Sequence, residues 1–469
     1  MTPEILDFTA NSAALPLMLL IAGLLILLLP LFVRRLNGAQ GFIAAGALIA
    51  MAFFFRRPPA AEVALFNGAL VLNPLSAYLW AFATAALGLV VLLSLARQAA
   101  PDESQGEYYF LLFMAAIGLM VLVAAGDLFT AFIALELLSL PVYALAGIRR
   151  SKPGLEAAYK YFMLGAFGSG MTVLGIAVLN ALYPALSFAA LKAGPASPLA
   201  LAGFLLVISG FAFKTALVPF HMWVPDAYEG APTPVAAFMG AAVKAGGVIV
   251  LWRLFHLFDG GPVIRIFWWL AAITVTFANL AALAQSGLKR LLAYSSVAHA
   301  GYLAVAFFGG RQGAEAVLYY LPVYAMATIG AFAVAAALET DEKGPRIEDL
   351  AGLAKARPWL AGAMAAFMFS LAGVPPLAGF FAKFYAFAGA VNSGYTGLVV
   401  LAVIMSAVSM YYYLKVTVVM YMKPAASEQV YEAPGLAEAV IALMAAGVLL
   451  AGVFSKPLLA IASNAARYF

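Results

Sequence analysis

Apolar runs of about 20 residues recur along nearly the whole of this 469-residue chain, separated by short polar turns. A helix of this length crosses the hydrocarbon core of a bilayer, because each residue adds about 1.5 Å. The hydrocarbon core offers no water to backbone N–H and C=O groups, so they must bond within the helix. The sequence therefore predicts an all-α, polytopic membrane protein.

The runs were delimited by proline, glycine and charged residues, and this gives about fourteen transmembrane helices. Their approximate bounds are 13–33, 40–55, 70–96, 108–125, 128–148, 156–183, 199–223, 234–257, 263–284, 290–308, 315–338, 358–390, 395–422 and 435–460. The weakly hydrophobic stretch Tyr183–Pro198 is predicted to be a surface loop, and the longest polar stretch is Glu339–Arg357. No soluble domain fits between the helices.

Composition excludes several function classes. Only 10% of the residues are charged, against about 25% in soluble proteins. Without cysteine the chain cannot hold a disulfide, a thiolate-bound metal or an iron–sulfur cluster. The three histidines, His221, His256 and His299, suggest no haem pair, and no phosphate-binding or dinucleotide-binding motif is present. A gradient or partner subunits must therefore drive any transport, and nucleic-acid binding is not expected.

Lys and Arg in the loops predict the orientation, because cytoplasmic loops carry an excess of both. The first apolar run follows an acidic start and is too long for a signal peptide. With the N-terminus outside, thirteen Lys and Arg fall in inward loops and six in outward ones. The inward set is Arg34, Arg35, Arg97, Arg149, Arg150, Lys152, Lys289, Arg290, Lys343, Arg346, Lys355, Arg357 and Lys423, and the outward set is Arg56, Arg57, Lys192, Arg265, Arg311 and Arg467. Both termini are predicted to face outward.

Five ionisable side chains fall near the middle of predicted membrane helices. A charge at the bilayer centre costs at least about 2.5–3.5 kcal/mol, so each must face the protein interior. For a single buried lysine, a snorkelling side chain or a structural ion pair is as good an interpretation as a proton pathway. Five on five helices favour a proton pathway, since a buried lysine can gain and lose a proton whereas arginine stays charged. The five are Glu136, Lys214, Lys244, His299 and Lys383.

Three further residues lie near helix starts. Lys160 is about one turn inside its helix, so snorkelling and a role in the pathway are equally good interpretations. Asp127 lies between two predicted helices and is interpreted as a solvated or capping residue. Thr233 is predicted to cap the helix that carries Lys244, with Pro234 as its first residue.

Prolines are predicted to break two of the charged helices. Pro219 leaves the carbonyl of Thr215 without its helical partner, next to Lys214. Pro375 and Pro376 free the carbonyls of Leu371 and Ala372, and Lys383 follows Pro376 by seven residues. In lipid a free carbonyl needs a polar neighbour, so each break predicts a polar site beside a lysine, although a simple packing kink is the alternative.

Broken helices at matching positions are typical of inverted repeats. The predicted division is 1–107 for the first helices, 108–257 for one five-helix repeat, 258–422 for the second and 423–469 for a final helix. The first repeat would hold an inward half-channel and the second an outward half-channel.

Several segments together resemble the antiporter-like membrane subunits of respiratory complex I and the related Mrp cation/proton antiporters, and most closely the subunit N branch. They are Leu135–Gly147 (LELLSLPVYALAG), Leu155–Gly165 (LEAAYKYFMLG), Gly210–Val235 (GFAFKTALVPFHMWVPDAYEGAPTPV), Asn279–Tyr302 (NLAALAQSGLKRLLAYSSVAHAGY) and Gly373–Lys383 (GVPPLAGFFAK). The resemblance covers roughly residues 70–422. Lysine at position 383 and the absence of a long C-terminal extension favour the subunit N branch.

The resemblance implies roles for the buried residues. Glu136 would pair with Lys160, Lys214 would load a proton, Lys244 would link the two half-channels, and His299 and Lys383 would lead to the outward exit.

It also implies a setting in the cell. The chain would be a non-redox, proton-translocating subunit of NADH-quinone oxidoreductase in a bacterial inner membrane, driven by quinone reduction elsewhere and next to subunits K and M. NADH, FMN, iron–sulfur clusters and quinone would bind other subunits, with no cofactor or metal on this chain. The alternatives are subunit M of the same complex, an Mrp-type Na⁺/H⁺ antiporter subunit, and a structural membrane scaffold without transport.

Overall fold

The structure is a computed structural model that describes residues 15–28, 39–54, 62–97, 99–193, 197–258, 260–339, 344–424 and 435–469. Part of the first expected helix and five of the orienting basic residues lie outside the described residues. These five are Arg34, Arg35, Arg56, Arg57 and Lys343. The outward placement of the termini therefore stays a prediction.

The described chain is almost entirely helical. An apolar helix spans Leu15–Leu28. The longer helices that follow are α2 (Gln40–Phe54), α3 (Pro74–Ala96), α4 (Gln105–Ala124), α5 (Leu128–Ala146), α6 (Lys152–Leu182), α8 (Pro198–Thr215), α11 (Lys244–Phe255), α12 (Gly261–Leu283), α13 (Leu288–Ala306), α14 (Gly310–Ala337), α16 (Pro358–Ala372), α17 (Ala378–Asn392), α18 (Thr396–Met422), α19 (Gly435–Val453) and α20 (Ser455–Ala465). Short elements are β1 (Val63–Leu65), β2 (Leu70–Leu72), α7 (Phe188–Ala193), α9 (Trp223–Gly230), α10 (Thr233–Phe238), the π-helix η4 (Met239–Val243), α15 (Leu353–Ala356) and η7 (Ala466–Tyr468).

Length and composition qualify ten helical segments of the described chain as membrane spans. Three shorter apolar helices accompany them. Large apolar side chains on the outer faces are exposed, among them Phe167 at 69%, Trp269 at 60% and Leu450 at 58%. Such faces need lipid rather than water around them. The chain is therefore an all-α, multi-pass membrane protein.

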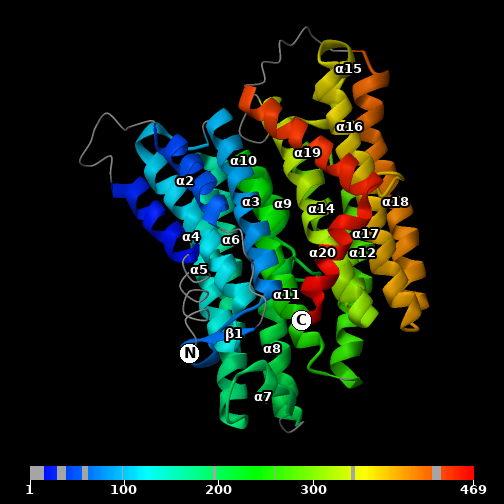
Figure 1. The fold of residues 1–469 in the computed structure, drawn as a ribbon. Coiled ribbons are helices and arrows are strands. Elements are labelled where there is room, and N and C mark those ends of the chain that lie inside the picture. The colour runs from blue at the N-terminus through cyan, green and yellow to red at the C-terminus, as the bar shows by residue number, and fades with distance from the viewer. Residues whose placement is uncertain are drawn as a thin grey trace.

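The helices run roughly parallel, with α7 and the β1–β2 hairpin near one end of the bundle and α15 near the other (Figure 1). In the hairpin, Val63 pairs with Leu72 and Leu65 with Leu70. The prediction of a plain surface loop over Tyr183–Pro198 was wrong in part, because α7 forms within it. Asp127 does cap a helix, since its carboxylate accepts the backbone N–H of Thr130 at 2.8 Å.

The segment α10–η4–α11 forms the centre of the bundle. Every residue from Thr233 to Phe255 except Arg253 is buried, so protein surrounds this span on every side. The helix does begin with Pro234 in its first turn, but the prediction that the Thr233 side chain caps this helix is wrong. The Thr233 hydroxyl instead donates to Glu339 at 2.8 Å, and Pro232 occupies the capping position.

Two helices are interrupted inside the bundle. α8 ends at Thr215 and α9 begins at Trp223, with Pro219 in the interval. α16 ends at Ala372 and α17 begins at Ala378, with Pro375 and Pro376 between them. Both intervals lie beside a buried lysine, and they position the site described below.

Candidate functional site

Lys214 lies in the last turn of α8, 1% exposed. Its Nζ donates to the Tyr161 hydroxyl at 3.1 Å and lies 5.6 Å from the centre of the Tyr143 ring. Trp223 stacks on Tyr161 at 4.0 Å and donates its indole N–H to the carbonyl of Phe213. The first residue of α9 is thus tied back to the end of α8, and this holds the lysine in a cage of aromatic rings.

Glu136 lies on α5 and accepts a 2.5 Å hydrogen bond from the Ser169 hydroxyl. Its carboxylate interacts electrostatically with Lys214. The expected pair between Glu136 and Lys160 is not formed in this structure. The reason is distance along α6: Lys160 lies near the polar end of that helix, with 43% of its side chain exposed, where other carboxylates reach it.

Those carboxylates belong to an ionic cluster formed by residues of α6, α9 and α13. Lys160 pairs with Glu156 at 2.7 Å and with Asp226 at 2.8 Å. Arg290 donates to both Asp226 and Glu229, at 2.9 and 2.8 Å. Asp226 therefore joins α6, α9 and α13, a role that the sequence analysis missed.

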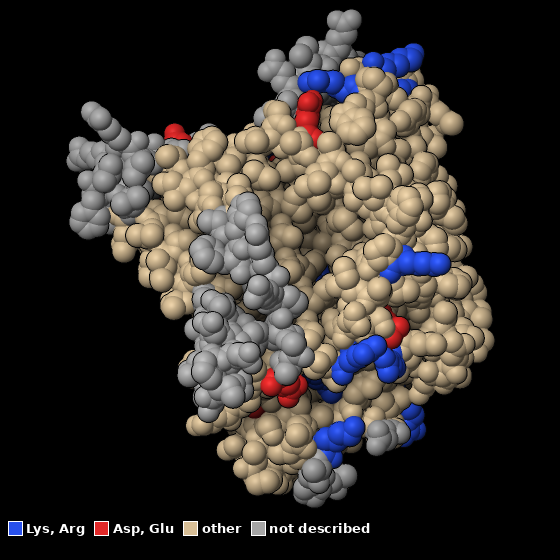
Figure 2. Space-filling view, viewed as in Figure 1, with Lys and Arg blue, Asp and Glu red and all other residues tan. Residues whose placement is uncertain are grey.

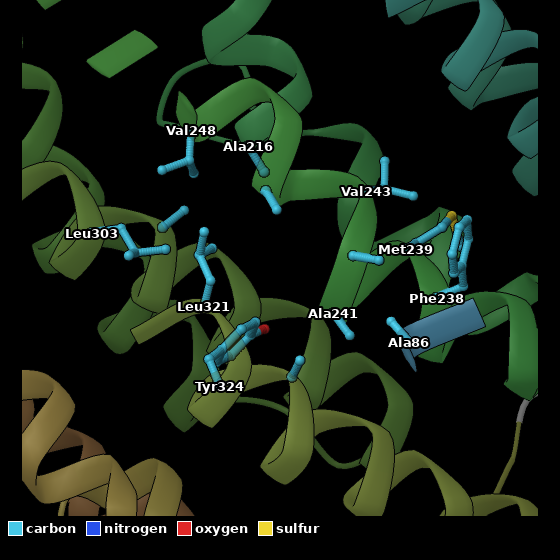
Figure 3. Close-up of a cluster of buried hydrophobic side chains, with 14 of the residues drawn as sticks. Ala86, Ala216, Phe238, Met239, Ala241, Val243, Val248, Leu303, Leu321 and Tyr324 are labelled. Carbon is cyan, nitrogen blue, oxygen red and sulfur yellow. The ribbon is translucent and has the colours of Figure 1, made fainter. Parts of the chain in front are cut away.

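Lys244 follows the π-helix η4 directly and is 4% exposed. Among the described residues its Nζ has no hydrogen-bond partner, and it lies 5.9 Å from the centre of the Tyr228 ring. Figure 3 shows a cluster of buried apolar side chains that includes Val243, the residue before Lys244. π-Helical turns often occur at functional sites. A buried ammonium group without a hydrogen-bond partner is costly in free energy.

α8 and α11 meet at Gly247, one turn after Lys244. A Cβ added at Gly247 would lie 2.8 Å from the side chain of Thr215 and 3.5 Å from the Cβ of Lys214. Only a residue without a side chain allows this approach. The glycine therefore brings the helices of Lys214 and Lys244 together.

His299 lies on α13, 3% exposed, within a group of tyrosines. Its Nδ1 is 2.8 Å from the Tyr320 hydroxyl and its Nε2 is 3.2 Å from the Tyr413 hydroxyl. Both ring nitrogens thus have partners that can donate or accept a proton. The imidazole is close enough to both Lys244 and Lys383 to interact with each electrostatically.

Lys383 lies on α17, 5% exposed. Its Nζ donates to the carbonyl of Ala372 and to the hydroxyl of Ser406, both at 2.9 Å. The other carbonyl expected to be freed, that of Leu371, faces His299. A cavity of ≈ 560 Å³ adjoins Lys383 and extends between α17 and α18 as far as Asn392.

The two breaks share one backbone geometry. At the first, Ala216 is left-handed (φ 65°) and the N–H of Leu217 bonds to the carbonyl of Ala212. At the second, Gly373 is left-handed (φ 88°) and the N–H of Val374 bonds to the carbonyl of Phe369. Both are the same helix-ending motif.

Tyrosine side chains connect the ionisable residues, and the sequence analysis missed them. Tyr161 contacts Lys214, Tyr228 lies beside Lys244 and bonds to Ser296, and Tyr302 lies 4.8 Å from Lys383 and bonds to Asn279. The tyrosines within the apolar runs were a signal in the sequence, because a tyrosine deep in an apolar span usually has a hydrogen-bond partner. Lys214, Lys244, His299 and Lys383 thus lie in one polar zone of a helical bundle.

A membrane bundle with two broken helices and a row of buried lysines defines the antiporter-like class of membrane subunits. Residues 125–409 match the family described as NADH:quinone oxidoreductase/Mrp antiporter, transmembrane. The chain therefore belongs to this family.

Comparisons with individual relatives support the same family assignment. NADH-quinone oxidoreductase subunit N of Trichlorobacter lovleyi is 38% identical, over 95% of each chain. A chain of respiratory complex I from Thermus thermophilus matches with a TM-score of 0.83 and 35% identity, covering 96% of this chain and 99% of that one. A chain of the Mrp complex of a Dietzia species has a TM-score of 0.84 but only 22% identity, covering 98% and 96%, and so shares the fold.

Proposed function

We propose that this chain is the proton-translocating subunit N of a bacterial NADH-quinone oxidoreductase. It would itself carry no cofactor and do no redox chemistry, and quinone reduction on other subunits would drive it. The curated relative named above is a subunit N over almost its whole length, which supports this choice over subunit M.

The observation that carries the proposal is the environment of Lys244. This ammonium group is buried, without a hydrogen-bond partner among the described residues, and lies in a span that protein encloses completely. A structural lysine would have a carboxylate or carbonyl beside it. A lysine without one is suited to holding a proton only briefly, as a relay requires.

Protons would enter at the first break. The ionic cluster of Lys160, Asp226 and Arg290 joins α6, α9 and α13, and Lys214 lies in the last turn of α8, before the interruption. A carboxylate that exchanges partners there would change the local charge near Lys214. Glu136 interacts electrostatically with Lys214. Its negative charge would keep the proton on Lys214 until Lys244 accepts it.

Protons would leave at the second break. His299 would pass a proton from Lys244 to Lys383, since its two ring nitrogens face different hydroxyl groups. The cavity beside Lys383 reaches Asn392, the last residue of α17. The lining of this cavity is mainly apolar, with Lys383, Ser406 and Asn392 as its polar members.

The shared geometry of the breaks supports two inverted repeats, 108–257 and 258–422, each with one half-channel. Subunits K and M of the complex would flank the chain, and both termini would face the periplasm.

The test is proton pumping by the assembled complex in proteoliposomes, with Lys214→Ala and Glu136→Ala. We expect fewer protons moved per electron in each variant. If both variants keep the wild-type proton-to-electron ratio and quinone reduction, the proposal is wrong.

The fold shared with the Dietzia Mrp chain makes a Na⁺/H⁺ antiporter subunit the second candidate. Sodium prefers carboxylate and carbonyl oxygens, and the described polar zone holds mainly lysines around a single carboxylate, Glu136. Transport of ²²Na⁺ by the purified chain distinguishes the two: sodium-dependent proton movement would support the antiporter.

A further inference from the structure

A pocket of ≈ 620 Å³, termed here the basic pocket, lies where α7, α11, α14 and η7 meet. Four cationic side chains line it: Lys192, Arg253, Arg311 and Arg467. No Asp or Glu is among the lining residues of the described chain, although Glu315 approaches Arg311 at 3.6 Å and Glu62 interacts electrostatically with Arg253. Figure 2 shows several Lys and Arg side chains, with a few Asp and Glu side chains beside them, on this part of the surface, near the C-terminus marked in Figure 1.

Arg253 forms the fixed wall of the basic pocket. Its guanidinium donates to the carbonyls of Ala125 and Val123 at 2.7 and 2.9 Å and lies 5.4 Å from the centre of the Phe188 ring. These contacts use two of the five N–H donors of the side chain. A rigid, permanently charged group therefore remains directed at the pocket.

The basic pocket lies at the level of the helix ends. α11 ends at Phe255, α14 begins at Gly310, and the 3-10 turn η5 (Phe307–Gly309) that joins α13 to α14 is adjacent. Trp252 and Phe469 line the pocket and pack on each other at 5.1 Å. Helix ends with aromatic side chains are typical of the headgroup region of a bilayer.

A second cavity, of ≈ 480 Å³, continues from the basic pocket and shares Lys192, Leu257 and Phe258 with it. Its remaining lining is mainly apolar, with Leu201, Phe204 and Val263. A charged compartment joined to an apolar one matches a ligand with an anionic head and a hydrocarbon chain. Free phosphate would use only the first compartment.

We infer that this pair of cavities binds an anionic phospholipid. The phosphate lies among Lys192, Arg253 and Arg467, and an acyl chain lies along the apolar cavity past Phe258. The site is remote from the lysine row, so the inference stands whether or not the chain pumps protons.

The experiment is native mass spectrometry of the purified full chain, titrated with phosphatidylglycerol, phosphatidylcholine, glycerophosphoglycerol or inorganic phosphate. The variants are Lys192→Gln and Arg467→Gln, both exposed, so that neither disturbs a buried contact. Arg265→Gln, an exposed arginine at the start of α12 outside both cavities, is the matched control. Thermal unfolding checks that every variant is folded.

We expect phosphatidylglycerol to bind more tightly than phosphatidylcholine, and each pocket variant to raise its Kd about fivefold. Arg265→Gln should leave the Kd unchanged. Equal binding of the two lipids, or an unchanged Kd in both pocket variants, would overturn the site. Competition by glycerophosphoglycerol or phosphate at the concentration of the lipid would overturn the lipid assignment, because the apolar cavity would then contribute nothing.

Discussion

The Nζ of Lys383 donates a 2.9 Å hydrogen bond to the carbonyl of Ala372, the last residue of α16. The ammonium group thus satisfies an acceptor that the helix break leaves open, at the negative end of the helix dipole. Lys214 is likewise in the last turn of its half-helix, α8. The end of α16 therefore supplies a partial negative charge beside the Lys383 cation, whereas the Nζ of Lys214 donates to the Tyr161 hydroxyl.

Lys383→Arg tests whether this lysine must lose its proton. The guanidinium can still donate to Ala372 and Ser406, so the fold should persist, but arginine stays protonated. We expect proton transfer through the chain to slow about 100-fold or more, measured as acidification of proteoliposomes. Lys415→Arg on α18 is the matched control and should pump normally; equal pumping by both variants would contradict the role of Lys383.

Lys244→Leu tests whether Lys244 contributes to the stability of the fold. The Nζ lacks a hydrogen-bond partner in the described structure and lies 5.9 Å from the centre of the Tyr228 ring. Replacing an unpaired buried charge by a hydrocarbon of similar volume should leave stability within about 1 kcal/mol of the wild type or raise it. The measurement is the thermal unfolding midpoint in detergent. A large drop in the midpoint would mean that Lys244 has a structural partner.

Gly247→Ala tests the contact between α8 and α11. The new methyl group would meet Thr215 at 2.8 Å, so the helices must separate. We expect a loss of about 1–3 kcal/mol in stability together with slower proton transfer from Lys214. Gly88→Ala on α3, where nothing lies within 4 Å of an added Cβ, should cost nothing. Equal effects of the two substitutions would exclude overpacking as the cause.

A double-mutant cycle tests the partner of Lys160. Lys160→Met combined with Asp226→Asn should show a coupling of about 0.2–1 kcal/mol, a small value because the pair is partly exposed. The same cycle with Glu136→Gln should show none. Coupling to Glu136 alone would restore the pair that the family resemblance implied.

Local features of the fold could be predicted from the sequence. Proline lacks an N–H, so the interruptions near Pro219 and Pro376 follow from the residue itself. The cap by Asp127 depends only on the next three residues. The depth of Lys244 follows from counting along an apolar run.

Contacts between distant segments could not be predicted in this way. Lys160 and Asp226 are separated by 66 residues, and only the packing of α9 against α6 brings them together. The partners of His299 come from α14 and α18, and no periodicity along α13 identifies them. The π-helical turn before Lys244 is likewise set by packing, since Gly240 and Gly246 fit closely against neighbouring side chains.

The central claim is that Lys244 relays protons through the middle of the bundle. The most direct test is the number of protons moved per electron by the assembled complex carrying Lys244→Leu in proteoliposomes. The account predicts a lower proton-to-electron ratio in a variant that is as stable as the wild type. A wild-type ratio, with normal quinone reduction, would contradict it.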